Sequence, residues 1–321
     1  MQVAIVGLGR MGKNIALHLL EQGVSVVAYN RTKDDVDEVV KAGAIGAYSL
    51  EEIPQKFTEQ PIVAILYIPS GGPTEEVLFG VLENKGVVRK GLTDILPQGS
   101  IIIDGGNSFF KDSQRRGKII AEKGLHFLDM GTSGGLEGAR NGGCLMVGGN
   151  KLIYEQVEPL LAKIATKDGY GYFGPAGAGH FVKMIHNAVE YGMMGSIAEG
   201  LGIISNFQYP ISNEKDNNNF KFDLAKVAKV WAHGSIVSGL LMDKMAAALE
   251  KNPTLEGISG EVPRGETESE MEWVGKTGIP NPVIQQARLE RVESRTKPSL
   301  IGKLIAALRR EFGGHAVKEE K

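Results

Sequence analysis

The feature that most constrains the fold of this chain is a glycine-rich turn close to the N-terminus. A short apolar run, residues 3–6, leads directly into the segment GLGRMG at residues 7–12. Apolar residues then recur at helical spacing over 15–20, and a second run, rich in β-formers, covers 24–29. Strand, glycine turn, helix and strand in this order open a dinucleotide-binding βαβ unit. We therefore predict an α/β protein that begins with a Rossmann-type doubly wound sheet.

Each glycine of this turn has a physical role in such a unit. Gly7 permits the tight turn, Gly9 lets the backbone approach a pyrophosphate, and Gly12 lets helix and strand pack closely. The alternative is a glycine-rich turn in an α/β domain that binds no nucleotide. The residues predicted to contact a dinucleotide here are Gly7, Leu8, Gly9, Arg10, Met11 and Gly12.

The end of the second predicted strand distinguishes the two nicotinamide cofactors. NAD enzymes usually place Asp or Glu there to bind the ribose 2′-hydroxyl, whereas a cationic residue suits a 2′-phosphate. This chain has Asn30, Arg31 and Thr32, and its next carboxylate comes at Asp34. A guanidinium can bind a phosphate through two hydrogen bonds, and the Thr32 hydroxyl can donate another. The sequence therefore favours NADP over NAD; the alternative is that Arg31 is a solvated loop residue.

Three further predicted strands, residues 62–68, 100–104 and 125–130, each end in a glycine-rich loop. Ligands of open α/β sheets bind outside the carboxyl ends of the strands, so we expect the three loops to form one crevice. Two of the loops carry small hydrogen-bonding residues beside accessible backbone amides. A surface turn without function would look similar. The residues concerned are Asn107, Ser133, Gly134 and Gly135.

From Gly177 onward the pattern predicts a different architecture. Helical periodicity replaces the strand signals, first in a long helix that no proline interrupts before Pro210. We therefore predict a Rossmann domain over 1–176 and an all-α domain over 177–321. The polar segment 213–219 is predicted to be an exposed loop.

The long predicted helix carries one polar patch on an otherwise apolar circumference. At roughly 100° per residue, five polar side chains of this helix share one side: Lys183, His186, Asn187, Glu190 and Tyr191. A helix of that kind is buried, and a buried ammonium or carboxylate is costly unless it is paired or used. One interpretation is a structural Lys–Glu contact inside a core. The other is a catalytic pair whose pKa values are shifted by burial.

Composition narrows the function classes. The chain has 321 residues, a net charge of −2 and one cysteine, Cys144. The near-neutral charge gives no sign of a nucleic-acid surface, and no apolar run approaches the length of a membrane span. A single cysteine excludes an internal disulfide framework and a Cys-rich metal site, and no metal site is predicted. The N-terminus has no secretion signal, so we expect a cytoplasmic protein. Cys144 lies in a predicted short strand among apolar neighbours, with no obvious base beside it, so we expect it to be a packing residue.

Taken together, these segments resemble 6-phosphogluconate dehydrogenase, the decarboxylating family of the β-hydroxyacid dehydrogenase superfamily, in its short-chain form. The likeness spans nearly the whole chain. The segments that carry it are residues 7–12, 30–32, 104–108, 133–135, 183–191 and 312–315. The resemblance implies oxidative decarboxylation of 6-phospho-D-gluconate to D-ribulose 5-phosphate with NADP, in the pentose phosphate pathway or in gluconate utilisation.

The resemblance also implies roles for the polar patch. Lys183 would be the general base that takes the proton from the 3-hydroxyl, and Glu190 the acid that protonates the enediol after CO2 leaves. Asn107 would serve both cofactor and substrate. The sugar acid would be held by Asn107, Ser133, Gly134, Gly135, His186 and Asn187.

The phosphate of the substrate would be bound by Tyr191 and by basic residues of the second domain. Arg291 matches one phosphate ligand of the family, with Arg288 as the alternative in register. Arg309 and His315 match residues that a neighbouring subunit supplies, which implies a homodimer or larger oligomer whose tail completes the neighbour's site. The chain departs from the long form of the family in the glycine-rich turn 261–268, where an acidic residue replaces a basic ligand. Arg264 is the candidate substitute there.

Two other functions fit part of the pattern. Another β-hydroxyacid dehydrogenase, such as one for 3-hydroxyisobutyrate, would share the glycine turn and Lys183 but would not need Glu190, Tyr191 or the basic tail. A non-catalytic NADP-binding sensor would need neither Lys183 nor Glu190, and the presence of both argues against it.

Overall fold

The computed structural model describes residues 1–83, 86–206, 222–265 and 267–320. The chain divides into two units, Met1–Met184 and Ile185–Lys321, which are described separately below. The division falls inside the long helix α8 (Ala178–Asn206), whose first turns belong to the first unit. The sequence places the boundary earlier, at residue 176, where the strand pattern stops. The segment 213–219, predicted to be a loop, lies outside the described residues.

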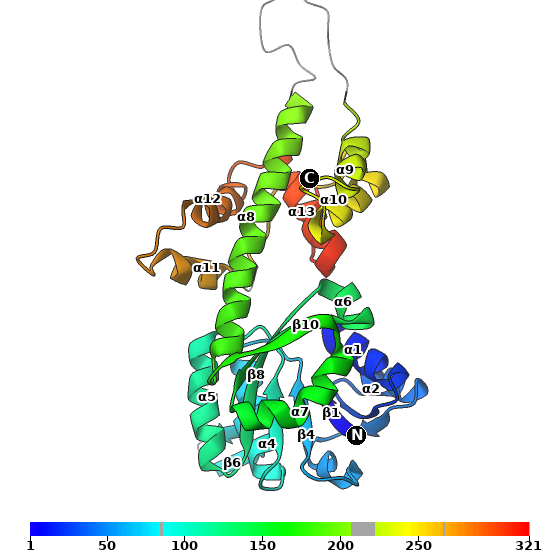
Figure 1. Cartoon of the computed structure of the whole chain (residues 1–321), viewed down its shortest axis with the longest axis vertical. Coiled ribbons are helices and arrows are strands. Elements are labelled where there is room, and N and C mark those ends of the chain that lie inside the picture. The colour runs from blue at the N-terminus through cyan, green and yellow to red at the C-terminus, as the bar shows by residue number, and fades with distance from the viewer. Residues whose placement is uncertain (84–85, 207–221, 266, 321) are drawn as a thin grey trace, which may run out of the picture. The chain divides into compact units, whose positions relative to one another are not determined.

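The first unit is built on an eight-stranded sheet with the order β10-β9-β8-β7-β4-β1-β2-β3 (Figure 1). Neighbouring strands are parallel except for β8 and β9, which are antiparallel. The strands are β1 (Gln2–Val6), β2 (Ser25–Tyr29), β3 (Ile45–Ala47), β4 (Val63–Leu66), β7 (Ile101–Asp104), β8 (His126–Ser133), β9 (Gly143–Gly149) and β10 (Ala165–Gly174). A separate pair is formed by β5 (Val81–Glu83) and β6 (Gly86–Arg89).

Helices cover both faces of this sheet. They are α1 (Arg10–Glu21), α2 (Lys33–Lys41), α3 (Gly72–Phe79), α4 (Leu92–Ile95), α5 (Phe110–Glu122), α6 (Gly135–Asn141) and α7 (Lys151–Ile164). Successive side chains of a strand point to opposite faces. Accordingly Val3 and Ile5 of β1 join one core cluster with α1 and α7, whereas Ala4 and Val6 join another with α5. The predicted doubly wound α/β sheet is confirmed.

In its described residues the second unit contains the rest of α8 and five further helices. These are α9 (Leu224–Ala232), α10 (Leu240–Lys251), α11 (Glu268–Gly275), α12 (Pro282–Glu293) and α13 (Leu300–Gly313). Apart from one isolated bridge between Ile258 and Glu319, the described part of this unit has no strand pairing. Its core joins Met194, Ala198 and Leu201 of α8 to residues of α10 and α13. The predicted all-α second domain is confirmed.

One expectation about α8 is wrong. The helix is not buried all round, because Val189, Met193 and Ile203 are each at least half exposed. Within the second unit, α10 and α13 pack against the side that carries Met194, while this other apolar side stays open in the single chain.

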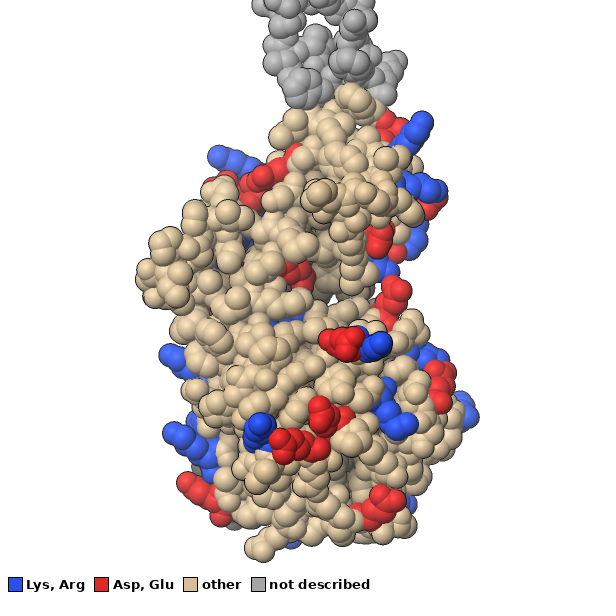
Figure 2. Space-filling model, in the orientation of Figure 1, with Lys and Arg blue, Asp and Glu red and all other residues tan. Residues whose placement is uncertain are grey.

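Two surface properties bear on function. No helix in the described ranges has the length and hydrophobicity that a membrane crossing requires. On the face drawn in Figure 2, basic and acidic side chains are interspersed, as a net charge of −2 predicts.

Candidate active site

The glycine turn between β1 and α1 has the geometry of a phosphate-approach loop. Gly7 has a φ of +99°, and a Cβ there would lie 2.5 Å from the carbonyl oxygen of Tyr67. A Cβ on Gly12 would overlap the carbonyl oxygen of Gly7, whereas one on Gly9 would meet only open space. Two of the glycines are thus required by the packing of the turn, and the third leaves the start of α1 open to a ligand.

Asn30, at the end of β2, holds this turn in place. Its Oδ1 accepts a hydrogen bond from the Leu8 backbone N–H at 3.1 Å, and its Nδ2 donates to Asp35 at 2.5 Å. The Gly7 N–H donates to the Tyr29 carbonyl at 2.9 Å. The side chain of Asn30 therefore positions the predicted dinucleotide loop. Its neighbours Arg31 and Thr32 are exposed.

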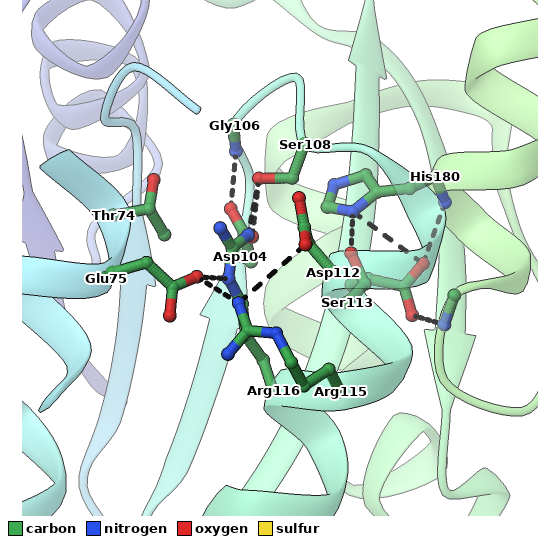
Figure 3. Close-up of polar contacts among 12 residues, drawn as sticks. Thr74, Glu75, Asp104, Gly106, Ser108, Asp112, Ser113, Arg115, Arg116 and His180 are labelled. Atoms are coloured by element: carbon green, nitrogen blue, oxygen red, sulfur yellow. Dashed lines mark hydrogen bonds and ion pairs between the residues drawn. The ribbon is translucent and has the colours of Figure 1, made fainter. Parts of the chain in front are cut away.

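The loop that carries Asn107 is fixed by a buried charge cluster that the sequence analysis missed (Figure 3). Arg116 of α5 is fully buried, and its Nη1 donates to Asp104 at 2.9 Å and to Ser108 at 2.8 Å. Asp104 also accepts from Ser108 at 2.8 Å and from the Gly106 N–H at 3.1 Å. The loop from Asp104 to Ser108 is therefore tied to α5 at both of its ends.

The same guanidinium also reaches helix α3. Arg116 Nε donates to Glu75 of α3 at 2.8 Å, and Arg115 donates to the same carboxylate at 2.6 Å. Burial raises the pKa of Glu75, but the hydrogen bonds from the two arginines outweigh it, so the pKa lies below its ordinary value. In the sequence, Arg116 stands in a charged stretch that resembles a solvated helix face. The residue that could have indicated this cluster is Asp104, because a carboxylate at the end of an apolar strand needs a buried partner.

A second buried polar cluster lies where α8 begins (Figure 3). Asp129 of β8 is fully buried and accepts hydrogen bonds from the backbone N–H groups of Gly177 at 2.6 Å and His180 at 2.7 Å. The His180 Nδ1 lies 2.6 Å from the Ser113 hydroxyl of α5. Sequence analysis gave none of these three side chains a role, since each looked like an ordinary core or turn residue.

Lys183 follows one turn after His180 and is 9% exposed. A Cβ on Gly131 of β8 would overlap the Cβ of Lys183 and lie 2.8 Å from its Cγ, so the lysine stem lies directly on the strand. Two residues further along β8 is Ser133, followed by Gly134 and Gly135 with φ values of +110° and +61°. In the first unit, β8 therefore packs against the stem of the candidate base and also leads into the predicted substrate loop.

The remaining residues of the polar patch continue along α8 in the second unit. Glu190 stands seven residues after Lys183, which is about two helical turns. Asn187 is buried, and its Oδ1 lies 3.3 Å from Nδ1 of His186. The spacing keeps the candidate base and acid on one side of a single helix.

The second unit contains a buried cluster of two arginines around Tyr191. The Arg291 guanidinium lies 3.3 Å from the centre of the Tyr191 ring, and Arg309 donates to the carbonyl oxygen of Pro263 at 2.9 Å. The Tyr191 hydroxyl lies 3.1 Å from the Thr267 hydroxyl. Arg291 and Arg309 are only 4% and 7% exposed, and within the described residues neither pairs with a carboxylate. Burial lowers the pKa of both arginines, that of Arg291 to about 10.

The other basic candidates lie differently. Arg264 is largely exposed, with its Nε 3.8 Å from Glu268, and Arg288 donates to Gln285 at 3.1 Å. Of Arg291 and Arg288, the two alternatives for one phosphate ligand, Arg291 is the residue that contacts Tyr191. Arg309 stands beside Tyr191 of its own chain, whereas the resemblance assigns its counterpart to a neighbouring subunit. His315 is exposed and packs edge-on against Phe312, after a turn in which Gly314 has a φ of +60°.

One sequence expectation near the site is wrong. Cys144 is exposed and not packed in the core. It pairs with Ser133 on the neighbouring strand, and because side chains alternate along a strand, it lies on the opposite face of β9 from the buried Leu145. No group of three or more His, Cys, Asp or Glu side chains that could hold a metal ion is found in the described ranges.

Comparison with known families agrees with the geometry of both units. The profile of the NAD binding domain of 6-phosphogluconate dehydrogenase matches residues 2–174. The profile of the C-terminal domain of the same enzyme matches residues 179–214.

This chain matches three relatives over different shares of their lengths. The chain is 38% identical over its whole length to YqeC of Bacillus subtilis, which is provisionally named a 6-phosphogluconate dehydrogenase and is also covered completely. It is 31% identical, over 99% of the chain and 98% of the relative, to an NAD(+)-dependent decarboxylating 6-phosphogluconate dehydrogenase of Haloferax volcanii. It is 40% identical over 211 residues to the NADP(+)-dependent enzyme of Bacillus subtilis, covering 63% of this chain but only 42% of that longer protein.

Solved structures give the same fold. The Plasmodium falciparum 6-phosphogluconate dehydrogenase, studied with NADP+ and with 6-phosphogluconate, is 28% identical with a TM-score of 0.75, over 92% of this chain and 62% of that one. A 3-hydroxyisobutyrate dehydrogenase of Salmonella typhimurium is 19% identical with a TM-score of 0.72, over 95% and 99%. The second likeness shows a shared fold alone.

Proposed function

The chain belongs to the 6-phosphogluconate dehydrogenase family, and from this membership we propose that it converts 6-phospho-D-gluconate to D-ribulose 5-phosphate and CO2 with NADP as the hydride acceptor. The observation that carries the proposal is the pair of buried arginines at Tyr191. Two buried cations that form no ion pair with a carboxylate of the described residues are costly, since the more distant Glu190 compensates their burial only in part, and a bound anion removes that cost. A substrate phosphate is such an anion.

This cluster distinguishes the proposed activity from that of a 3-hydroxyisobutyrate dehydrogenase. The substrate named for the 3-hydroxyisobutyrate enzymes has a carboxylate and a hydroxyl but no phosphate. A site for such a substrate would have no use for Arg291 and Arg309 buried around one tyrosine. A phosphate, with its three terminal oxygens, can accept hydrogen bonds from both guanidinium groups and from the hydroxyls of Tyr191 and Thr267.

The polar side of α8 supplies the proton transfers of the proposed reaction. Lys183, in its neutral form, takes the proton of the substrate 3-hydroxyl as the hydrogen on C3 leaves as hydride. The open side of the glycine turn at Gly9 fits a dinucleotide, which when bound supplies the hydride acceptor. As the resulting 3-keto acid loses CO2, Lys183 returns its proton to the C3 oxygen and so forms the enediol; Glu190 then delivers a proton to C2 while Lys183 takes back the proton of the C3 hydroxyl, which leaves the ketone. The nearly buried position of Lys183 favours the neutral amine that a base requires.

The proposal predicts a definite stoichiometry. With 6-phosphogluconate and NADP, and without added metal, the protein is expected to form NADPH and CO2 in equal amounts. Absorbance at the NADPH band and trapped CO2, measured in the same reaction, check this. NADPH without CO2 would move the assignment to a dehydrogenase that does not decarboxylate. Absence of both products, with 6-phosphogluconate and with 3-hydroxyisobutyrate, would favour a sensor.

Cofactor choice is proposed to depend on Arg31. Replacing Arg31 by Ala is expected to raise the KM for NADP by about 10- to 100-fold, because a charge-assisted hydrogen bond contributes about 1.5–3 kcal/mol. The KM for NAD should not change. Lys33→Ala, which removes a neighbouring cation at the start of α2, is the matched control. Initial rates with both cofactors give the two KM values. Equal effects of the two substitutions on the KM for NADP would indicate that Arg31 is a solvated loop residue.

We also propose that the protein forms a homodimer. Large apolar side chains are exposed on α8 and α12 of the second unit, among them Val189, Met193 and Val283. A surface of this kind favours a protein–protein contact. The segment after Gly314, with the exposed His315, is proposed to reach the neighbour's site. Sedimentation of the protein as a monomer would contradict this part of the proposal.

A further inference from the structure

Strand β8 presents three functional positions on one of its faces. Asp129, Gly131 and Ser133 are two residues apart, so all three lie on the same face of the strand. Asp129 binds the start of α8, Gly131 lies under the stem of Lys183, and Ser133 opens the predicted substrate loop. The distance between the start of α8 and the substrate loop is therefore set by the five residues 129–133 of one strand.

The contact between Asp129 and α8 is specific in register. The carboxylate accepts from two backbone N–H groups three residues apart, those of Gly177 and His180, at 2.6 and 2.7 Å. These are donors that the first turn of a helix leaves unpaired, and a negative charge there also interacts favourably with the helix dipole. A shift of α8 by one residue along its axis would break both bonds. Asp129 thus fixes the helix against sliding.

Two further contacts prevent α8 from lifting or rotating. A Cβ on Gly179 would lie 2.7 Å from both the Asp129 carbonyl oxygen and the Gly148 nitrogen, so backbone packs on backbone with no side chain between. The His180 ring is held at 2.6 Å by Ser113 of α5, and all three polar side chains of this cluster are buried. Lys183, one turn further on, has little freedom in the position of its Cα.

We propose that Asp129 is a positioning residue, which sets the register of α8 on β8 and thereby places the Lys183 amine relative to the substrate held at Ser133. The inference rests on the proposed function of Lys183 as the base. It explains why a fully buried carboxylate stands at this point of the sheet: two helix amides satisfy its charge, with the His180 Nδ1 at 4.0 Å, and the length of the side chain fixes the offset between strand and helix.

The test is the kinetics of Asp129→Asn. The amide keeps the volume of the side chain but can accept only one of the two hydrogen bonds, because its NH2 group faces the other N–H. We expect kcat to fall about 10- to 100-fold, as misplacement of a catalytic group by about 1 Å does. The KM for NADP should stay within about twofold. With deuterium at C3 of the substrate, the isotope effect on kcat should rise, since the step that involves Lys183 becomes slower.

Two controls separate positioning from loss of stability, and a second test variant stands in if the first does not fold. Asp223→Asn removes another helix-capping carboxylate, at the start of α9, and should leave kcat and the isotope effect unchanged. Leu161→Ala lowers stability through a cavity under α7 and should also leave both unchanged below its melting temperature. If Asp129→Asn does not fold, Gly131→Ala displaces the Lys183 stem directly and should give the same kinetic signature.

The outcomes are distinguishable from failure of the proposed function. An unchanged kcat and isotope effect in Asp129→Asn, or in Gly131→Ala if that is the variant that folds, would overturn the inference. If the wild-type protein turns over none of the hydroxyacids, the proposed function fails, and amide hydrogen exchange over residues 177–184 decides the register instead. Faster exchange there in Asp129→Asn, with none in Asp223→Asn, supports the inference; equal exchange overturns it.

Discussion

Replacing Lys183 by Met is expected to lower kcat by about a thousandfold or more, the loss associated with removal of a general base. Methionine keeps the Cβ and Cγ that lie on Gly131, so the contact between α8 and β8 survives the substitution. Only the amine that accepts the substrate proton is removed. The dinucleotide loop at Gly7 to Gly12 is untouched, and binding of NADPH, followed by its fluorescence, should be unchanged.

Glu190→Gln is the comparison that tests the division of roles. It removes the proposed acid while leaving Lys183 in place, so oxidation should continue more readily than protonation of the enediol. Release of CO2 in the first turnover should therefore survive in Glu190→Gln and be absent in Lys183→Met, as rapid-quench measurements can show. Turnover of Lys183→Met at a substantial fraction of the wild-type rate would remove the lysine from the reaction.

The parts of this protein that could be predicted from sequence are those encoded by local pattern. Glycine spacing with flanking strand and helix signals identified the loop at Gly7, and helical periodicity identified α8 with Lys183 on its polar side. The helical second unit followed from the same change of period after Gly177. In each case the residues that define the feature lie within one or two elements of secondary structure.

Features that depend on contacts between distant segments could not be predicted in this way. Arg116 looks like any charged residue of a surface helix, and only the fold brings it to Asp104 and Glu75. Asp129 bonds to amides about fifty residues away in sequence. The exposure of Cys144 is a smaller case of the same kind, because a run of apolar neighbours does not show which face of β9 is covered.

Replacing Arg291 or Arg309 by Met is expected to reduce kcat/KM for 6-phosphogluconate by about 10- to 100-fold each, since a hydrogen bond to a charged group contributes about 1.5–3 kcal/mol. The effect should fall mainly on KM, because the phosphate is remote from the reacting carbon. Arg288→Met on the same helix as Arg291 is the matched control, as the Arg288 guanidinium donates to Gln285. Initial rates over a range of substrate concentrations measure the difference, and a loss in Arg288→Met equal to that in Arg291→Met would contradict the assignment of the phosphate site.

Stability gives an independent measure of the same site. Burial lowers the pKa of Arg291 from its ordinary 12.5 to about 10, which means that the folded protein disfavours the charged guanidinium by roughly 3 kcal/mol relative to the unfolded chain. At neutral pH the group is still protonated in both states, so this cost is present in the free protein. Arg291→Met should therefore melt at the same temperature as the wild type or higher when no ligand is present.

With an anion bound, the wild type should melt at a higher temperature than Arg291→Met. Inorganic phosphate or 6-phosphogluconate binds only the folded wild type at this cluster, and binding to the folded state raises the melting temperature in proportion to the logarithm of ligand concentration. Arg291→Met and Arg309→Met should lose most of this increase, while Arg288→Met keeps it. Because a structural arginine pair would make the Met variants less stable and leave the response to phosphate unchanged, the sign of the ligand-free shift and the size of the phosphate response together decide whether these two buried charges exist for an anionic substrate.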